Sequence, residues 1–523
     1  MDLFIKIAML VVFFGSMIGV GLYCRKKSTD VNGFVLGGRS VGPWLTAFAY
    51  GTSYFSAVVF VGYAGQFGWE FGISSTWAGI GNALIGSMLA WAVLGRRTRV
   101  MSQHLNSATM PQFFEGRFQS KPLKLAASVV IFVFLIPYTA SLYNGLSRLF
   151  GMAFDIDYSV CVIVMAVLTA IYVIAGGYMA TAINDFIQGI VMLVGIVAVI
   201  IAVLKNQGGF MQALQSMSEV TDGAAQDTPG VYASFFGPQP LALLGVVLLT
   251  SLGTWGLPQM VQKFYAIKDE KSINKGMIIS SVFALVVAGG CYFLGGFAHL
   301  IFPSTEAMQA AGGYDAIIPQ MLSSLPSILI AVVMVLVLSA SMSTLSSLVM
   351  ASSSTLTLDF IKGAVAPKMN EKKQLVIIRV LIAVFIAISV AIAIVQYKLK
   401  LGFIAQLMGI SWGALAGAFL GPFLYGLYWK RATKLSVWVS FIFSCTVMVA
   451  NMFLKSYFPA LLQSPINAGV FCMLASLVIV PVVSLLSKAP DKEYVEKIFS
   501  CYDKKVLVSA KDAIGEPVEE DVK

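Results

Sequence analysis

Charged residues are scarce in this chain. Of its 523 residues, 11% are charged and 58% are hydrophobic, whereas soluble domains are about 25% charged. A soluble chain of this length could not cover its surface with so few charges, which excludes a set of soluble domains. The sequence instead predicts an all-α polytopic membrane protein.

Histidine and paired cysteines are also rare. The chain has 2 histidines, and its 6 cysteines are scattered without paired spacing, mostly within apolar runs. These counts argue against a histidine metal cluster and a disulfide framework. No clustered catalytic set occurs in the apolar runs, so we expect no enzyme. No P-loop occurs, which argues against ATP as the energy source.

Long apolar runs occupy most of the chain. A hydrocarbon core of about 30 Å needs about 20 apolar residues per helix. Thirteen runs meet this requirement, at 3–24, 43–67, 73–95, 125–150, 158–176, 180–204, 238–262, 277–303, 326–358, 375–397, 402–428, 436–454 and 467–487. We therefore expect a membrane transport domain over residues 1–487 and a cytoplasmic tail over residues 488–523.

The basic residues predict the orientation of these spans. The net charge of +10 comes from short clusters between apolar runs rather than from a continuous stripe, so no nucleic-acid partner is expected. If the clustered side is cytoplasmic, all 35 lysines and arginines lie inside except Lys6, Arg148, Lys205, Lys398, Lys400 and Lys455. The N-terminus is then outside and the C-terminus cytoplasmic.

Two spans contain helix breakers near mid-depth. The second span has Gly51 followed by a hydroxyl cluster, and the seventh has Gly253, Gly256 and Pro258. These spans are five helices apart and run in opposite directions, which predicts a 5+5 inverted repeat over about 43–428, with spans 1, 12 and 13 peripheral. Carriers of this kind bind their solute at such breaks. The alternative is that the glycines and the proline only kink or pack the helices.

A single formal charge, Asp185, lies well inside a predicted span. A buried carboxylate costs several kcal/mol, so Asp185 needs a cation, a proton or a pocket rich in donors. The alternative is that Asp185 caps the start of the sixth span.

The ninth span has a stripe of hydroxyl groups. Ser343, Ser346 and Ser347 share one helical face because they are three and four residues apart, and Ala340 and Thr344 lie beside them. Hydroxyl and carbonyl oxygens are hard ligands, and this set favours Na⁺ over Ca²⁺. The serines could instead serve close helix packing and bond to the preceding turn.

Four motifs in this order resemble the sodium/solute symporter family over residues 30–435, with the closest likeness to the bacterial proline and pantothenate carriers. The motifs are Leu36–Ser40, Gly176–Gly177 with Asn184–Asp185, Gly256–Pro258 and Met342–Leu345. The resemblance implies a leucine-transporter-like fold, sodium-coupled import by alternating access, and a bacterial inner membrane.

The resemblance also implies two sodium sites. Carried over by motif, the first site consists of Thr52, Phe55, Ala340, Ser343 and Thr344. Some members hold a second ion, for which the matching positions are Asp185, Ser343, Ser346 and Ser347.

The candidate solute-binding residues are aromatic or uncharged and polar. They are Tyr54, Ser56, Tyr138, Thr254, Trp255, Gln259 and Trp412. Such a set suits a small neutral, zwitterionic or carboxylate solute, whose carboxylate could bind at the N-terminus of a half-helix. Proline carriers of the family have an aspartate at the position of Tyr54 and an aromatic residue at that of Thr254, and sugar carriers have a polar pair at Val58–Val59. These departures argue against proline and more strongly against a hexose.

Sodium-coupled import is therefore the predicted function, with the solute, sodium ions and the lipid bilayer as partners and no obligate protein partner evident. One alternative is a proton-coupled carrier in which Asp185 is the protonatable group. Another is a sensor or receptor, although the tail is too short for most output domains.

Overall fold

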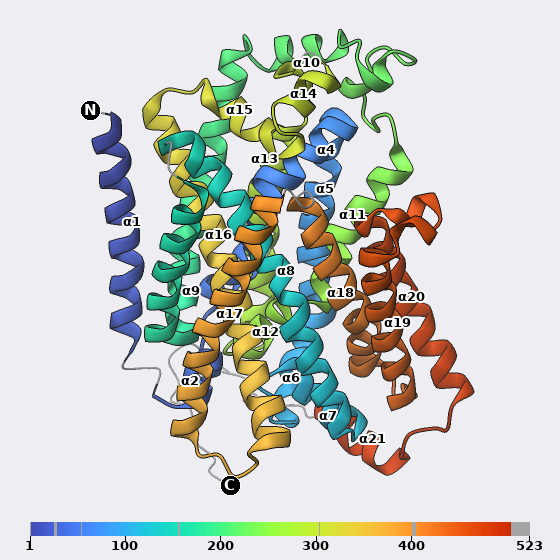
Figure 1. The fold of residues 1–523 in the computed structure, drawn as a ribbon. Coiled ribbons are helices and arrows are strands. Elements are labelled where there is room, and N and C mark those ends of the chain that lie inside the picture. The colour runs from blue at the N-terminus through green and yellow to red at the C-terminus, as the bar shows by residue number, and fades with distance from the viewer. Residues whose placement is uncertain are drawn as a thin grey trace, which may run out of the picture.

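The computed structural model describes residues 2–25, 29–53, 55–154, 157–302, 304–399 and 404–503. Apart from one isolated bridge between Val41 and Ile267, this part of the chain is built from helices (Figure 1). The α-helices up to residue 266 are α1 (Asp2–Cys24), α2 (Val31–Leu36), α3 (Pro43–Thr52), α4 (Ala64–Phe71), α5 (Thr76–Gly81), α6 (Arg96–His104), α7 (Met110–Phe118), α8 (Lys121–Phe154), α9 (Tyr158–Asn206), α10 (Phe210–Ser218), α11 (Pro240–Gly256) and α12 (Pro258–Ala266). The later ones are α13 (Lys271–Gly295), α14 (Thr305–Ala310), α15 (Ile317–Ser323), α16 (Ser327–Thr355), α17 (Glu371–Leu399), α18 (Ile404–Tyr428), α19 (Lys434–Phe453), α20 (Pro465–Leu486) and α21 (Lys492–Phe499). Four π-helical stretches are η3 (Val58–Tyr63), η5 (Asn82–Leu89), η6 (Trp91–Gly95) and η11 (Leu356–Val365).

Within the described residues, 10 helices are long and apolar enough to cross a membrane, or 11 if the bent pair α11 and α12 forms one span. Two of these helices, Val58–His104 with 47 residues and α9 with 49, exceed the roughly 20 residues of one crossing. Each contains a glycine with positive φ, Gly72 at 63° and Gly177 at 58°. The count of thirteen spans stays a prediction.

Gly177 separates the two predicted spans 158–176 and 180–204. Its φ of 58° and ψ of −153° belong to a region that only glycine adopts readily. A Cβ at this position would also lie 2.8 Å from the carbonyl oxygen of Phe34. Glycine is therefore required here, because it lets α9 change direction while packing against α2.

Helices end near both positions where broken spans are predicted. Helix α3 ends at Thr52 and the π-helix η3 begins at Val58. Helices α11 and α12 meet at Leu257, whose backbone is extended, and they are bent by 48°. Pro258 begins α12 at the position that proline prefers, since its missing N–H has no partner in a first turn.

Helix α16 lies in the centre of the bundle and packs against α8, α9 and α17. Every residue from Val333 to Thr355 is buried, as expected for a helix surrounded by others. Helix α1 covers α9 on one flank, while α19 and α20 pack on α18 on the other (Figure 1).

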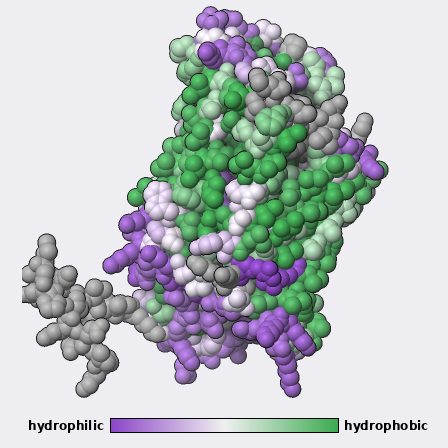
Figure 2. Space-filling model, turned by 90° about the vertical axis from the view of Figure 1, so that its left-hand side faces the viewer, coloured by the Kyte–Doolittle hydropathy of each residue, from purple (hydrophilic) through white to green (hydrophobic). Residues whose placement is uncertain are grey.

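Hydrophobic side chains form a broad band across the face shown in Figure 2, and hydrophilic side chains gather at its two ends. Exposed apolar residues on α1 and α9, such as Val12 and Val194, contribute to the apolar surface of the bundle. Helix α1 begins at the end where α10 and α14 lie, and α7 and α21 lie at the opposite end (Figure 1). This distribution is that of a protein crossing a bilayer.

Helix α21 belongs to the tail predicted over residues 488–523, and it docks on the bundle. Its Tyr494 hydroxyl donates to the Gly116 carbonyl at 2.5 Å, and Glu496 pairs with Lys430 at 2.7 Å. The tail beyond Asp503 lies outside the described residues.

Candidate functional site

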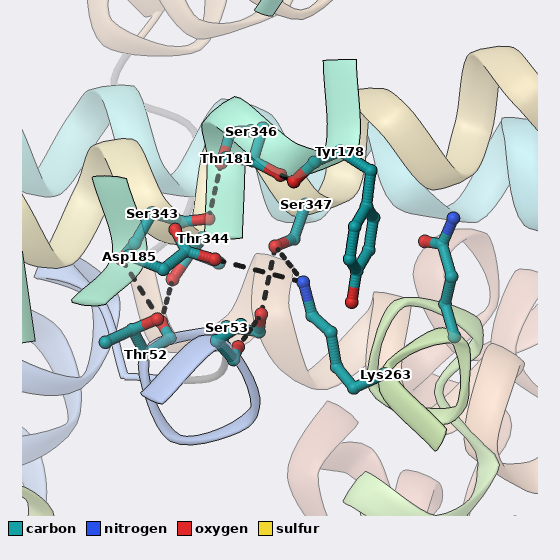
Figure 3. Close-up of polar contacts among 12 residues, drawn as sticks. Thr52, Ser53, Tyr178, Thr181, Asp185, Lys263, Ser343, Thr344, Ser346 and Ser347 are labelled. Carbon is teal, nitrogen blue, oxygen red and sulfur yellow. Dashed lines mark hydrogen bonds and ion pairs between the residues drawn. The ribbon is translucent and has the colours of Figure 1, made fainter. Parts of the chain in front are cut away.

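The site begins where the end of α3 faces α16 (Figure 3). The last carbonyls of an α-helix have no intrahelical N–H partner, and in α3 such a carbonyl is turned toward hydroxyls of α16. The Thr52 carbonyl oxygen lies 3.3 Å from Ser343 Oγ and 3.0 Å from Thr344 Oγ1. The Phe55 carbonyl oxygen, within the break, lies 3.1 Å from Thr344 Oγ1.

This cluster has more oxygen lone pairs than protons to fill them. Thr344 has one hydroxyl proton, but the Thr52, Phe55 and Ala340 carbonyl oxygens all lie 3.0–3.1 Å from its Oγ1. Ser343 likewise has one proton and two carbonyls in reach, those of Thr52 at 3.3 Å and Ala340 at 3.1 Å. The donor set fits a small hard cation such as Na⁺, and it consists of all five residues predicted for the first sodium site.

A buried lysine lies beside this cluster (Figure 3). Lys263 extends from α12, and its Nζ lies 3.9 Å from Asp185 Oδ2 and 3.0 Å from Ser347 Oγ. The same Nζ is 5.1 Å from the centroid of the Tyr178 ring. The side chains of Lys263 and Asp185 are 2% and 0% exposed, so their charges face each other away from solvent.

Lys263 lies one residue beyond the predicted end of the seventh span at residue 262, so it is absent from the predicted site residues. Helix α12 continues to Ala266, so the lysine is inside the helix and buried. Asp359 is buried too, since η11 extends the ninth span to Val365. The prediction that Asp185 is the single charge inside a span is therefore wrong. Two features of the sequence could have predicted Lys263 as a site residue. Asp185 has no partner charge within the predicted spans, and Lys263 directly follows the predicted end of one span.

The residues predicted for the second sodium site are arranged differently from those of the first. Asp185 and Ser347 both contact Lys263, whereas Ser343 faces the first cluster. The Ser346 hydroxyl donates to the Ser343 carbonyl at 2.9 Å, which is the back-bonding considered for this stripe.

Asp185 lies inside α9 beyond Gly177. Among the described residues, neither of its carboxylate oxygens accepts a hydrogen bond. It therefore does not cap a helix by accepting from backbone N–H groups.

Two candidate solute-binding residues meet next to the break between α11 and α12. Tyr138 from α8 and Trp412 from α18 contact each other edge to face, with ring centroids 6.0 Å apart. Both are buried, and within the described part of the chain the Tyr138 hydroxyl and Trp412 Nε1 have no hydrogen-bond partner. Trp412 also packs on Gly253, where a Cβ would lie 2.8 Å from its ring.

The remaining candidates differ in how their polar groups are used. Gln259 is fully buried, and neither its amide nitrogen nor its amide oxygen has a hydrogen-bond partner among the described residues. The Ser56 hydroxyl accepts from the Val58 N–H at 3.2 Å. Tyr54 lies outside the described residues.

Thr254 and Trp255 are bonded to the neighbouring π-helix η5. Thr254 Oγ1 lies 3.1 Å from the Gly86 carbonyl oxygen and 2.8 Å from that of Ser251. Trp255 Nε1 donates to the Ile85 carbonyl at 3.0 Å. Their polar groups therefore already have partners within the protein.

The sequence model of the Sodium:solute symporter family matches residues 34–443. The chain belongs to this family. Two similar proteins come from bacteria. The sodium/proline symporter of Staphylococcus aureus is 30% identical over 438 residues, 82% of this chain and 81% of that protein. The osmoregulated proline transporter OpuE of Bacillus subtilis is 27% identical over 439 residues, which cover 81% of this chain and 84% of that protein.

The fold is also similar to that of a solved Na⁺-coupled symporter. The substrate-bound, outward-open structure of a Na⁺-coupled sialic acid symporter matches with a TM-score of 0.74 at 17% identity, covering 93% of this chain and 99% of that one. At this identity the match establishes the fold alone. The resemblance found in the sequence is confirmed, and family and fold point to a multi-pass membrane transporter rather than an enzyme.

Proposed function

We propose that the protein couples inward movement of Na⁺ to import of a small neutral, zwitterionic or carboxylate organic solute by alternating access. The cluster of five oxygens contributed by Thr52, Phe55, Ala340, Ser343 and Thr344 carries this proposal. It joins the break after α3 to the buried helix α16, so a bound cation would stabilise one geometry of the break.

Coupling follows if the solute binds that geometry more tightly. Ser56 is in the same break as Phe55, and its backbone position depends on where the break is held. A ligand that favours one conformation raises the affinity of a second ligand for the same conformation, and the effect is reciprocal. Na⁺ in the cluster would thus raise the affinity of the solute, and the solute would raise that of Na⁺.

The solute would bind at Tyr138, Trp412 and Gln259, whose buried polar groups have no partner in the described part of the chain. Buried polar groups without partners are costly, and a solute that hydrogen-bonds to them removes this cost. Thr254 and Trp255 would shape the wall from the side of η5. Proline is the solute named for the two relatives, but the departures at Tyr54 and Thr254 favour a different small solute.

The architecture we propose for this function has thirteen spans. An inverted repeat over about 43–428 would form the core, and the helices at 3–24, 436–454 and 467–487 would be peripheral. The breaks after Thr52 and at Leu257, together with the positive φ of Gly72 and Gly177, support this division. The N-terminus would face outward and the C-terminus the cytoplasm, in the inner membrane of a bacterium.

A thermal-shift screen of the purified protein against small metabolites, in NaCl and in choline chloride, tests the function. A ligand that binds the folded state raises its apparent stability by mass action. We expect one or a few compounds of the panel to raise the melting temperature in NaCl and to have little effect in choline chloride. Thr344→Ala should lose this dependence on Na⁺. A solute that acts equally in both salts and depends on pH instead would contradict the proposal in favour of proton coupling through Asp185.

A further inference from the structure

The Lys263 ammonium lies among residues that the sequence assigned to a second sodium ion. It contacts Ser347 Oγ at 3.0 Å and faces Asp185 Oδ2 at 3.9 Å, and both residues are fully or almost fully buried. A buried charge is tolerated only when it is paired and hydrogen-bonded. Lys263 therefore supplies the positive charge that the carboxylate of Asp185 requires.

The hydrogen bonds around Lys263 have one consistent direction (Figure 3). An ammonium group has donors and no acceptor, so Ser347 Oγ accepts from Lys263. Ser347 can then donate its own proton to Ser53 Oγ at 2.9 Å, and Ser53 donates to the Ala49 carbonyl in α3. A chain of donors thus runs from the ammonium to the end of α3, one residue from Thr52 of the first cluster.

Among the described residues, the three serine hydroxyls predicted for the second site are each engaged in another contact. Ser347 is bound by the ammonium, Ser343 faces the first cluster, and Ser346 donates to a backbone carbonyl. Asp185 alone would have to bind the ion, in direct competition with Lys263. A cation approaching it would also be repelled by the ammonium, because the two positive charges would lie in a poorly screened interior.

We propose that the ε-ammonium of Lys263 is a tethered cation that stands at the second sodium site predicted from Asp185 and Ser347, so that the carrier binds one Na⁺ per cycle. The inference rests on the proposed sodium coupling, and it fixes the stoichiometry of that coupling. Removing the ammonium while keeping Asp185 should open the position to a second Na⁺.

Equilibrium binding of ²²Na⁺ alone to the purified full chain, without any solute, tests the proposal. We expect 1 mol of Na⁺ per mol of protein for the native chain and 2 mol for Lys263→Gln, because the variant leaves Asp185 and the serine hydroxyls without a cation. The double variant Lys263→Gln with Asp185→Asn should return to 1 mol. Lys268→Gln removes a half-exposed lysine just beyond α12 and should remain at 1 mol.

The outcomes separate this inference from the function on which it rests. If the native chain binds 2 mol of Na⁺, the proposal of a tethered cation is wrong and the proposed sodium coupling is unaffected. If the native chain binds no Na⁺, the proposed sodium coupling itself is wrong. A folded Lys263→Gln that binds one ion would also overturn the inference. Since the native count needs no substitution, the inference can be tested even if the variant does not fold. If the variant does fold, its thermal stability should rise with Na⁺ more steeply than that of the double variant.

Discussion

Thr344 lies at the centre of the proposed sodium site. Its one proton can satisfy only one of the three carbonyl oxygens 3.0–3.1 Å away. A helix that needed this threonine only for packing would require a single bond to the preceding turn. At Thr344 the carbonyl oxygens come from both α16 and the break after α3, and this convergence of two elements fits a ligand that brings positive charge.

Thr344→Ala should weaken Na⁺ binding by about 10–100-fold, because a bond to a charged group contributes about 1.5–3 kcal/mol. Ser354→Ala is the matched control, since Ser354 is buried in the same helix and donates only to its own α16 backbone. Titration of each purified variant with ²²Na⁺ measures the effect. If the two variants bind Na⁺ with equal affinity, Thr344 does not contribute to the sodium site.

The residues of the proposed first sodium site were predicted from short motifs, and the structure brings them together, while sodium binding there stays a prediction. Lys263 was not predicted, since a lysine at the end of an apolar window usually extends to the membrane surface. Its burial depends on how α12 bends after Leu257 and passes α9 and α16, and no local pattern records that path. Likewise, the sequence does not show that Thr254 and Trp255 donate to η5 rather than toward a solute.

At the scale of helices, α4 and α13 approach each other closely. A Cβ on Gly68 would lie 1.9 Å from the Gly295 carbonyl oxygen, and a Cβ on Gly295 would lie 2.1 Å from that of Ala64. Small residues at such crossings let two backbones touch. Helix α4 follows η3 and the α3 break, so this crossing holds the second half of the broken span against α13.

Gly295→Ala should therefore lower the free energy of unfolding by about 1–3 kcal/mol, the usual cost of overpacking. The added methyl group would meet a backbone oxygen that cannot rotate away. Gly289→Ala in the same helix is the control, because its Cβ would have only an ordinary 3.8 Å contact with Leu285. A thermal melt in detergent should show a lower midpoint for the first variant and little change for the second. The opposite order would contradict the close packing of α4 and α13.

Helix breakers in the sequence mark positions where the structure interrupts helices, as Gly51 before the end of α3 and Pro258 at the start of α12 show. Helix α9 covers the two predicted spans 158–176 and 180–204, and its backbone departs from helical geometry at Gly177 between them. The π-helices η3, η5 and η11 were not predicted, since π-helices are rare and the apolar runs were read as ordinary α-helices.

At the scale of the whole molecule, the two ends of the bundle differ in the segments that they carry. Helix α10 lies at one end and α21 at the other (Figure 1). In the proposed orientation, which follows from the basic clusters of the sequence, the end with α21 faces the cytoplasm.

This orientation can be measured with single cysteines. Glu219 directly follows α10, Lys492 is the first residue of α21, and both residues are exposed. We choose Glu219→Cys and Lys492→Cys as the two variants. A membrane-impermeant maleimide should label the first variant in intact cells and the second only after permeabilisation. The native chain, whose cysteines are buried or half-buried, gives the background. The reverse pattern of labelling would invert the proposed topology.

A cation attached to the chain also limits how far a cell can concentrate the solute. One Na⁺ moving inward gains about 2.3 kcal/mol per 100 mV, which for a neutral solute corresponds to about fiftyfold accumulation. A second mobile Na⁺ would raise that ratio to about two-thousandfold. The Lys263 ammonium is never released into the cytoplasm, so the cell has one ion to extrude for each solute taken up. Uptake at low external sodium then falls in proportion to the sodium concentration rather than to its square.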